Sequence, residues 1–278
     1  MSIGADLLRS FGVLGERAAL PKVRALHLPR GMASDGKQSA FCAVELEGEV
    51  LGLAYVGLGE SRARLAAMDG AALSGAGPMT LLAGCASDDE AQRVLGLAAA
   101  NALTRWLFDQ AGFVPPESTD SLGGIRAGKG ECIGMVGLFL PLLDRVLASD
   151  ADLTVLELPP EEPGERGGWR VTLEAGDLAA CTQVLCTSTV LLNDTLERVR
   201  AACRSAREFA LIGPGAGCLP DPLFARGVTR LGGSWVTDAA GVIDALESGE
   251  RWTAHARKFD LGQGDYPGFE ALLERVDG

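Results

Sequence analysis

Histidine and paired cysteines are scarce in this sequence, and the shortage bears on metal binding. His27 and His255 are the two histidines among 278 residues. The seven cysteines are odd in number, lie far apart and form no C-x-x-C pair, so the sequence does not predict a closed structural zinc site. Most of them lie in apolar stretches, which favours small buried side chains in a reducing compartment.

Basic clusters and long apolar runs are also missing. The 25 Lys and Arg residues face 37 Asp and Glu residues, which gives a net charge of −12. Such a chain repels phosphate backbones and anionic lipid surfaces, so neither a nucleic acid nor a membrane is expected as a partner. No apolar run approaches the roughly 20 residues that cross a bilayer. The N-terminus lacks a basic segment followed by a long apolar core, so we expect a cytoplasmic protein without a signal peptide.

The sequence also lacks the short motifs that are typical of common enzyme classes. It contains no G-x-S-x-G elbow, no phosphate-binding G-x-x-x-x-G-K-[ST] loop and no H-E-x-x-H pair. His255 has no identifiable acidic partner in the sequence and is expected at the surface. No general acid–base pair can be named from spacing, so the sequence leaves open whether the protein is an enzyme.

The first 115 residues predict a small domain of strands followed by helices. Extended runs cover 22–28, 40–46 and 50–58, and a helix begins at Pro78. The longest helical pattern follows Ser87-Asp88-Asp89-Glu90, which has the form of a capping box with Ser87 as N-cap and Glu90 as its N3 partner. Asn101 and Arg105 border the apolar stripe of this helix and face either a cleft or solvent.

Residues 116–130 are rich in Pro, Ser and Gly and predict a linker. Strands and helices alternate over 131–250, which predicts a parallel sheet flanked by helices and an α/β fold class. Residues 251–278 form a less regular C-terminal extension, in which 268–276 is expected to be a helix.

Ligands of open parallel sheets bind beyond the carboxyl ends of the strands, so the loops at those ends hold the candidate residues. An incomplete glycine pattern follows the first strand, an acid ends the second, and hydroxyl and amide side chains follow the third. Asp194 and Glu197 fit a helix N-cap and its N3 partner, which leaves the other polar residues of this loop unexplained. The candidates for ligand binding in these loops are Gly134, Gly137, Glu157, Thr187, Ser188, Thr189 and Asn193.

The loop after the fourth strand, 213–224, is rich in glycine and proline and exposes backbone amides to an anion. Gly213, Pro214 and Gly215 are its candidate ligand-binding residues. Cys218 lies in the middle of this loop, outside an apolar run. It is a candidate soft-metal ligand or nucleophile, and the alternative is a free buried thiol.

Three segments carry a resemblance to a known family: "VGLFLPLL" (136–143), "VLCTSTVLLNDTLE" (184–197) and "IGPGAGCLPDPLFARGVTRLGGSWVTD" (212–238). They resemble the second domain of the family described as "putative heavy-metal chelation", a domain of unknown function. Its members typically read T-G-T-T-x-x-N-x-T-x-E, then G-P-S-T-P-L, P-x-x-F and G-x-x-V-x-D. The runs 51–57 and 95–103 are similar to its first domain, so the resemblance covers roughly 40–250.

The resemblance implies a small α+β domain like the enolase N-terminal fold, then a Rossmann-like domain, with the site in the cleft between them. It also implies a pterin-, flavin- or siderophore-like ligand and a link to metal handling. The cofactor is not identified; a transition metal or metal chelate is what the resemblance implies. Two departures stand out: Ser188 replaces the usual Gly of T-G-T, and Gly215-Ala216-Gly217 replaces Ser-Thr-Pro.

Three hypotheses follow from the sequence. The first is a small-molecule-binding protein, with or without catalysis, whose ligand Asn193 orients by hydrogen bonds. The second is a non-catalytic metal-binding or metal-chaperone protein that uses Cys218 with nearby carboxylates. The third is a methyltransferase-like protein that binds S-adenosylmethionine, for which Glu157 is the best support. We expect a homodimer, because symmetric dimers are the commonest oligomers of soluble proteins.

Overall fold

The structure is a computed structural model that describes residues 2–30, 40–68, 70–118 and 124–276. Part of the predicted linker, residues 119–123, therefore lies outside the described residues. Within these ranges no helix combines the length and the apolar character needed to cross a bilayer.

The N-terminal half contains a three-stranded antiparallel sheet in the order β1-β2-β3. Its strands are β1 (Val23–His27), β2 (Phe41–Leu46) and β3 (Val50–Tyr55). A tight turn joins β2 to β3, and it requires positive φ at Gly48 (84°) and Glu49 (62°). All three strands correspond to extended runs predicted from the sequence.

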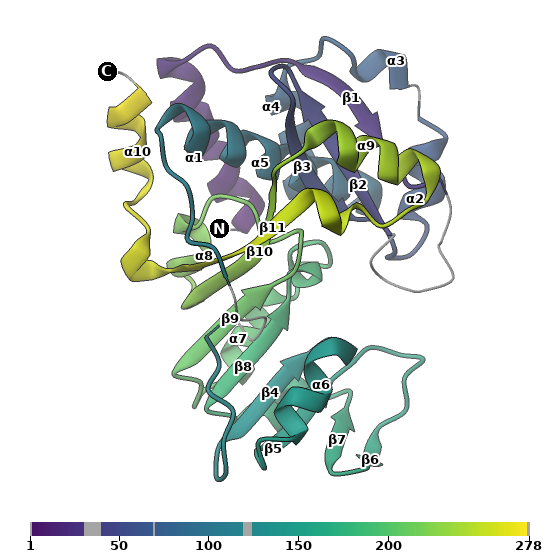
Figure 1. Cartoon of the computed structure of the whole chain (residues 1–278), viewed down its shortest axis with the longest axis vertical. Coiled ribbons are helices and arrows are strands. Elements are labelled where there is room, and N and C mark those ends of the chain that lie inside the picture. Colours follow the sequence, from purple (N-terminus) through teal and green to yellow (C-terminus); the bar gives the residue numbers. More distant parts are fainter. Residues whose placement is uncertain (1, 31–39, 69, 119–123, 277–278) are drawn as a thin grey trace.

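Both faces of this small sheet are covered, which explains why β2 is buried along its whole length. The long helix α5 (Glu90–Gln110) packs on β3, where Gly52 lets the helix backbone approach closely. The other face packs against α9 (Ala239–Ser248) and Trp252, which come from the far end of the chain. The sequence pattern did not predict this return of the C-terminal segment, which is visible in Figure 1.

The second sheet has eight strands in the order β11-β10-β9-β8-β4-β5-β7-β6. Six neighbouring strands, from β10 to β7, run parallel, and an antiparallel strand borders them at each edge. The strands are β4 (Cys132–Val136), β5 (Asp152–Leu156), β6 (Gly164–Arg166), β7 (Trp169–Thr172), β8 (Gln183–Thr187), β9 (Glu208–Ile212), β10 (Arg230–Val236) and β11 (Ala256–Gly262).

Alternating side chains of the parallel strands supply two separate apolar layers. Ile133 and Met135 of β4 pack with α6 (Leu140–Leu147) on one face. Val184 of β8 packs with α7 (Leu196–Ala202) on the other face, in a core that continues into α5 and the N-terminal sheet. The remaining helices are α1 (Ile3–Arg17), α2 (Ser61–Ala66), α3 (Gly70–Leu73), α4 (Pro78–Leu82), α8 (Asp221–Phe224), α10 (Phe269–Val276) and the 3-10 turns η2 (Ala83–Ala86), η3 (Ala175–Leu178), η4 (Ser188–Leu191), η5 (Trp252–His255) and η6 (Gln263–Asp265).

Two predicted helix starts are wrong. The N-cap of α5 is Asp89, whose carboxylate accepts a hydrogen bond from the amide of Gln92, while the Ser87 hydroxyl accepts from the amide of Asp89. The helix α7 begins at Leu196, and Asp194 has a left-handed backbone (φ 55°) instead of capping it. In both cases several adjacent polar residues could have served as caps, and loop geometry selected among them.

The mixed α/β class, with a small sheet-containing part followed by a mostly parallel sheet, is confirmed. Among the elements that were not predicted are α1, β11 and the two strands of the β6–β7 hairpin. The domain boundaries at 115, 130 and 250 stay predictions, as do the enolase-like and Rossmann-like labels. One buried core contains Phe11, Leu103 and Phe209, so the two sheets share their packing.

Candidate functional site

The carboxyl ends of β4 and β8 meet where the chain order of the parallel sheet reverses, which is the usual ligand position in such sheets. Gly137 and Thr187 lie side by side at this switch point. A Cβ atom added to Gly137 would lie 3.0 Å from Thr187 Cγ2, and Gly137 has a positive φ of 79°. Both residues thus lie at the carboxyl ends of their strands, and their role in ligand binding stays a prediction.

The polar side chains of the β8–α7 loop mostly bind one another. The Thr187 hydroxyl accepts hydrogen bonds from the amide and the hydroxyl of Thr189, at 3.3 and 3.1 Å. The Asn193 carbonyl oxygen accepts from the Thr195 hydroxyl at 2.6 Å. These contacts account for part of the hydroxyl and amide content that the sequence left unexplained, since they shape the loop itself.

Glu157, at the end of β5, is engaged by the neighbouring loop. Its carboxylate accepts a hydrogen bond from the backbone amide of Leu138 at 2.5 Å and one from its own neighbour Leu158 at 3.3 Å. This carboxylate therefore closes the β4–α6 loop, in the place where a ribose would be held under the S-adenosylmethionine hypothesis.

Ser188 and the start of the Gly213 loop are packed together beneath α5. The Ser188 side chain is buried, and its hydroxyl lies within 2.6 Å of the position that a Cβ of Gly213 would take, and within 3.1 Å of that of Gly215. Leu97 of α5 contacts the same place, and Arg93 donates to the Leu192 carbonyl oxygen at 2.5 Å. The serine that departs from the family pattern thus fills this turn.

Gly134 lies inside β4, away from the strand ends. A Cβ here would come within 3.3 to 3.4 Å of Leu178, Val184 and Cys181, so the glycine makes room for core side chains.

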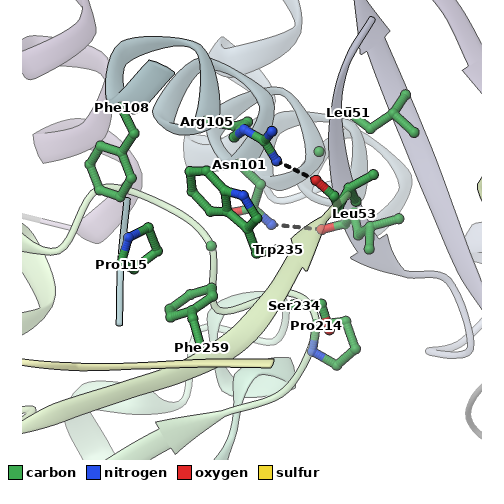
Figure 2. A pocket seen from close by; sticks show the side chains of 13 residues that line it. Leu51, Leu53, Asn101, Arg105, Phe108, Pro115, Pro214, Ser234, Trp235 and Phe259 are labelled. Atoms are coloured by element: carbon green, nitrogen blue, oxygen red, sulfur yellow. Dashed lines mark hydrogen bonds between the residues drawn. The ribbon is translucent and has the colours of Figure 1, made fainter. Parts of the chain in front are cut away.

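A cavity opens between the two sheets, where α5, β3, β10 and the β9–α8 loop converge (Figure 2). Its volume is about 30 Å³, enough for roughly two water molecules or for one edge of a larger ligand. The residues that line it are Leu51, Gly52, Leu53, Asn101, Arg105, Phe108, Pro115, Pro214, Gly217, Ser234, Trp235, Val236 and Phe259.

Asn101 supplies a buried side-chain amide to this cavity, and only one end of that amide is hydrogen-bonded. Its side-chain nitrogen donates to the carbonyl oxygens of Leu53 (2.6 Å) and Gly215 (3.2 Å). Because both partners are acceptors, the orientation of the amide is fixed. Its carbonyl oxygen Oδ1 is then left buried without a hydrogen-bond partner. The sequence left open whether Asn101 faces a cleft or solvent. The structure places it in the cleft, and the residue is only 5% exposed.

Trp235 forms the aromatic wall of the cavity. The Arg105 guanidinium lies over its ring at 3.9 Å and also donates to the Val236 carbonyl oxygen at 2.7 Å. Arg257, across the β10–β11 ladder, lies 5.6 Å from the same ring. One nitrogen of Arg257 donates to the Pro115 carbonyl oxygen, while its buried Nη1 has no partner. The cleft thus holds an acceptor that lacks a donor, beside cationic groups stacked on indole.

The donor set does not fit a transition-metal ion. Cys218 is buried, and burial raises the pKa of its thiol to about 12, so the metal-binding thiolate is disfavoured. Among the described residues no group of three or more histidine, cysteine, aspartate or glutamate side chains could hold a metal. The residues lining the cavity include no carboxylate, imidazole or thiol.

The expectation that His255 has no acidic partner is wrong, while its side chain is 35% exposed, as a surface position requires. Its Nδ1 lies 2.8 Å from the Asp238 carboxylate, which also caps α9 through the amide of Gly241. The hydrogen bond from Gly241, followed by that from His255, lowers the pKa of Asp238. The pair lies at the start of α9 and is explained by helix capping.

The fold and the cleft define a mixed α/β protein in which a small antiparallel sheet packs on a mostly parallel one. The chain belongs to the DUF364 family, described as "Putative heavy-metal chelation", whose model matches residues 121–261. This confirms the resemblance drawn from the loop motifs.

Two solved structures of this family share the fold. The DUF364 protein of unknown function from Desulfitobacterium hafniense is 23% identical, with a TM-score of 0.70, and the match covers 92% of this chain and 97% of that one. The DUF364 protein of unknown function from Pyrococcus horikoshii is 17% identical, with a TM-score of 0.66, covering 94% and 98%. No curated protein matches the chain.

Among the lining residues that the sequence did not reveal are Ser234, Trp235 and Phe259. They lie in "RLGGSWV" and in the tail that was expected to be irregular, and no spacing rule marks them. The adjacent Gly232-Gly233 was a signal, because a Cβ at Gly233 would lie 2.4 Å from the Phe259 ring. An aromatic residue seated over a strand glycine indicates close packing, although not a cavity.

Proposed function

We propose that the protein binds a small organic molecule in the cleft between the two sheets, where a hydrogen-bond donor of the ligand contacts Asn101 Oδ1. The unpartnered Oδ1 carries this proposal, because a buried acceptor without a donor costs about 1–3 kcal/mol. A ligand N–H or O–H group would remove that cost. Binding is favoured over catalysis, since the lining residues offer no carboxylate, imidazole or thiol as general acid, base or nucleophile.

The shape and chemistry of the lining support a planar ligand with N–H groups on its edge. Trp235, Phe108 and Phe259 supply aromatic surface, and the amide oxygen supplies the acceptor. Pterins and flavins, which the family resemblance implies, have such an edge. The cavity of about 30 Å³ takes the edge alone, so the rest of the ring would lie at the mouth.

A buried water molecule is the competing occupant of the same space, because waters commonly satisfy buried polar groups. The two occupants differ in a measurable way: a water site gives no response to added ligand. A thermal-shift series with a pterin, a flavin, a catecholate siderophore and S-adenosylmethionine separates them. A ligand at about 100 times its Kd adds about 2.7 kcal/mol of stability.

A matched pair of glycine variants then locates the site. In Gly217→Ala the new methyl group contacts Asn101 at 3.6–3.7 Å, an ordinary packing distance, and narrows the cavity. Gly128→Ala adds a methyl group where nothing lies within 4 Å and serves as control. We expect the ligand-induced shift to be lost in Gly217→Ala and kept in Gly128→Ala.

Asn193→Ala tests the alternative position at the switch point. A shift that survives Gly217→Ala but disappears in Asn193→Ala would move the binding site to the β8–α7 loop. No shift with any compound, together with a loss of stability in Gly217→Ala, would assign the cavity to water, because the new methyl group would displace the molecule that satisfies Oδ1.

A further inference from the structure

Two cysteines of the parallel sheet lie unusually close together, at the N-terminal ends of the neighbouring central strands β4 and β8. Cys132 begins β4, and Cys181 lies two residues before β8. Their sulfur atoms are 3.2 Å apart, and both thiols are free. A disulfide has a sulfur–sulfur distance of about 2.05 Å, so a shift of roughly 1 Å would join them.

The backbone around the pair holds the two side chains on the same face of the sheet. The Thr182 amide donates to the Cys132 carbonyl oxygen at 2.9 Å, which fixes the approach of the two segments. Gly134 lies two residues after Cys132 in β4, on the same face of the sheet. A Cβ atom added to Gly134 would lie 3.4 Å from the Cβ of Cys181. The glycine therefore leaves Cys181 the space beside Cys132 that a larger residue would occupy.

The two thiols differ in access. Cys132 is partly exposed, whereas Cys181 is buried. Burial, and then the neighbouring Cys132, raises the pKa of the Cys181 thiol well above its ordinary value. The adjacent Glu131 carboxylate is paired with Arg207 at 2.7 Å, which neutralises the charge nearest to Cys132 in the chain. An oxidant therefore reaches Cys132 first, and Cys181 lies behind it.

We propose that Cys132 and Cys181 form a redox-active dithiol, which a peroxide converts to an intramolecular disulfide. The Cys132 thiolate attacks a peroxide oxygen, the O–O bond breaks, and hydroxide leaves, giving a sulfenic acid on Cys132. The Cys181 sulfur then attacks the Cys132 sulfur, the S–O bond breaks, and the Cys181 proton leaves with the departing hydroxide as water. In sum, two thiols and one hydrogen peroxide give one disulfide and two waters, and a small thiol reverses the step by exchange.

Peptide mapping after oxidation tests this proposal. The purified full-length protein is treated with hydrogen peroxide, remaining thiols are alkylated under denaturing conditions, and tryptic peptides are analysed without reduction. We expect peptide 130–145, which contains Cys132, to be joined to peptide 171–198 through Cys181, with Cys186 alkylated. Added dithiothreitol should separate the two peptides.

Serine variants provide the control. Cys132→Ser and Cys181→Ser should each abolish the joined peptide, whereas Cys42→Ser, at a buried thiol in β2, should leave it unchanged. If Cys181→Ser does not fold, Cys132→Ser still decides the result, because its side chain is partly exposed. A disulfide from Cys181 to Cys203, which lies close enough to interact with its charge, would overturn the proposal. So would stable sulfinic acid on Cys132 with Cys181 still alkylated.

Discussion

The side-chain nitrogen of Asn101 lies 2.6 Å from the carbonyl oxygen of Leu53, and this buried hydrogen bond ties α5 to β3. A second bond from the same nitrogen reaches Gly215, so one amide holds the helix, the small sheet and the β9–α8 loop. In Asn101→Asp an oxygen replaces this nitrogen and faces two carbonyl oxygens. We expect a loss of about 3 kcal/mol or more at pH 7, measured by urea unfolding.

The same variant should show a characteristic pH dependence. Burial and the facing carbonyl oxygens raise the folded-state pKa of the introduced carboxyl above its unfolded value of about 3.9. The variant is therefore least impaired at low pH, and its deficit grows as pH rises from that value. Asn193→Asp is the control, because an acceptor is what the Thr195 hydroxyl requires there. Equal losses in both variants at pH 7 would argue against the buried amide network.

Gly52 allows α5 to pack closely on β3, so replacing it with a larger residue should push the helix away from the strand. A Cβ at this position would lie 2.0 Å from the Ala98 carbonyl oxygen and 2.2 Å from the Ala102 nitrogen, both backbone atoms that cannot rotate away. We expect Gly52→Ala to cost about 3 kcal/mol of unfolding free energy. In Gly12→Ala, within α1, nothing lies within 4 Å, so helix propensity should add about 0.5–1 kcal/mol. A neutral Gly52→Ala would contradict this close contact.

Gly137 and Thr187 allow backbone strain to be separated from contact at the switch point. Gly137→Ala places a methyl group 3.0 Å from Thr187 Cγ2 and keeps a φ of 79°. We expect a cost of about 2 kcal/mol, of which positive φ accounts for about 1–2. Thr187→Ser removes Cγ2 but keeps the hydroxyl that binds Thr189. In a double-mutant cycle the serine should recover only the contact part; full recovery would show that φ costs nothing here.

The elements that the sequence predicted are those with strong local patterns. The apolar run of β4 and the stripe of α5 depend on periodicity within one segment, and both were found. The return of α9 and Trp252 to the small sheet could not be read from the sequence, because it depends on contacts between residues some 200 positions apart. The β6–β7 hairpin, whose first strand is fully exposed, lacks the apolar alternation that marks a strand.

The candidate site shows the same division. The strand-end rule placed Gly137, Glu157 and Thr187 at the carboxyl ends of the parallel strands, where the structure also has them. It could not show that Glu157 would be occupied by a backbone amide of the neighbouring loop. Asn101 was recognised as a border residue, but its partner Gly215 is 114 positions away. Only the packing of the two halves brings Trp235 against α5 and creates the cavity.

The ion pair between Asp6 of α1 and Arg226, two residues after α8, should make stability depend on pH. Arg226 binds Asp6 at 2.8 Å, and its hydrogen bond lowers the pKa of that carboxyl. A carboxyl whose folded-state pKa is depressed stabilises the fold above its unfolded pKa of about 3.9 and loses this contribution as pH falls through the folded value. Asp6→Asn should therefore cost about 1 kcal/mol at pH 7, and the difference from the unaltered protein should shrink below about pH 4.

Glu197→Gln is the matched comparison, because Glu197 binds the same guanidinium at 2.7 Å but is 62% exposed. Solvent screens that pair more strongly, so its loss should cost less than half as much as the loss of Asp6. Guanidinium unfolding adds salt, so urea unfolding between pH 3 and pH 8 is the suitable measurement. If the Asp6→Asn difference stays constant across this range, the charge of Asp6 does not hold α1 on α8. The apolar contacts of Leu7 and Phe11 would then account for the docking of that helix.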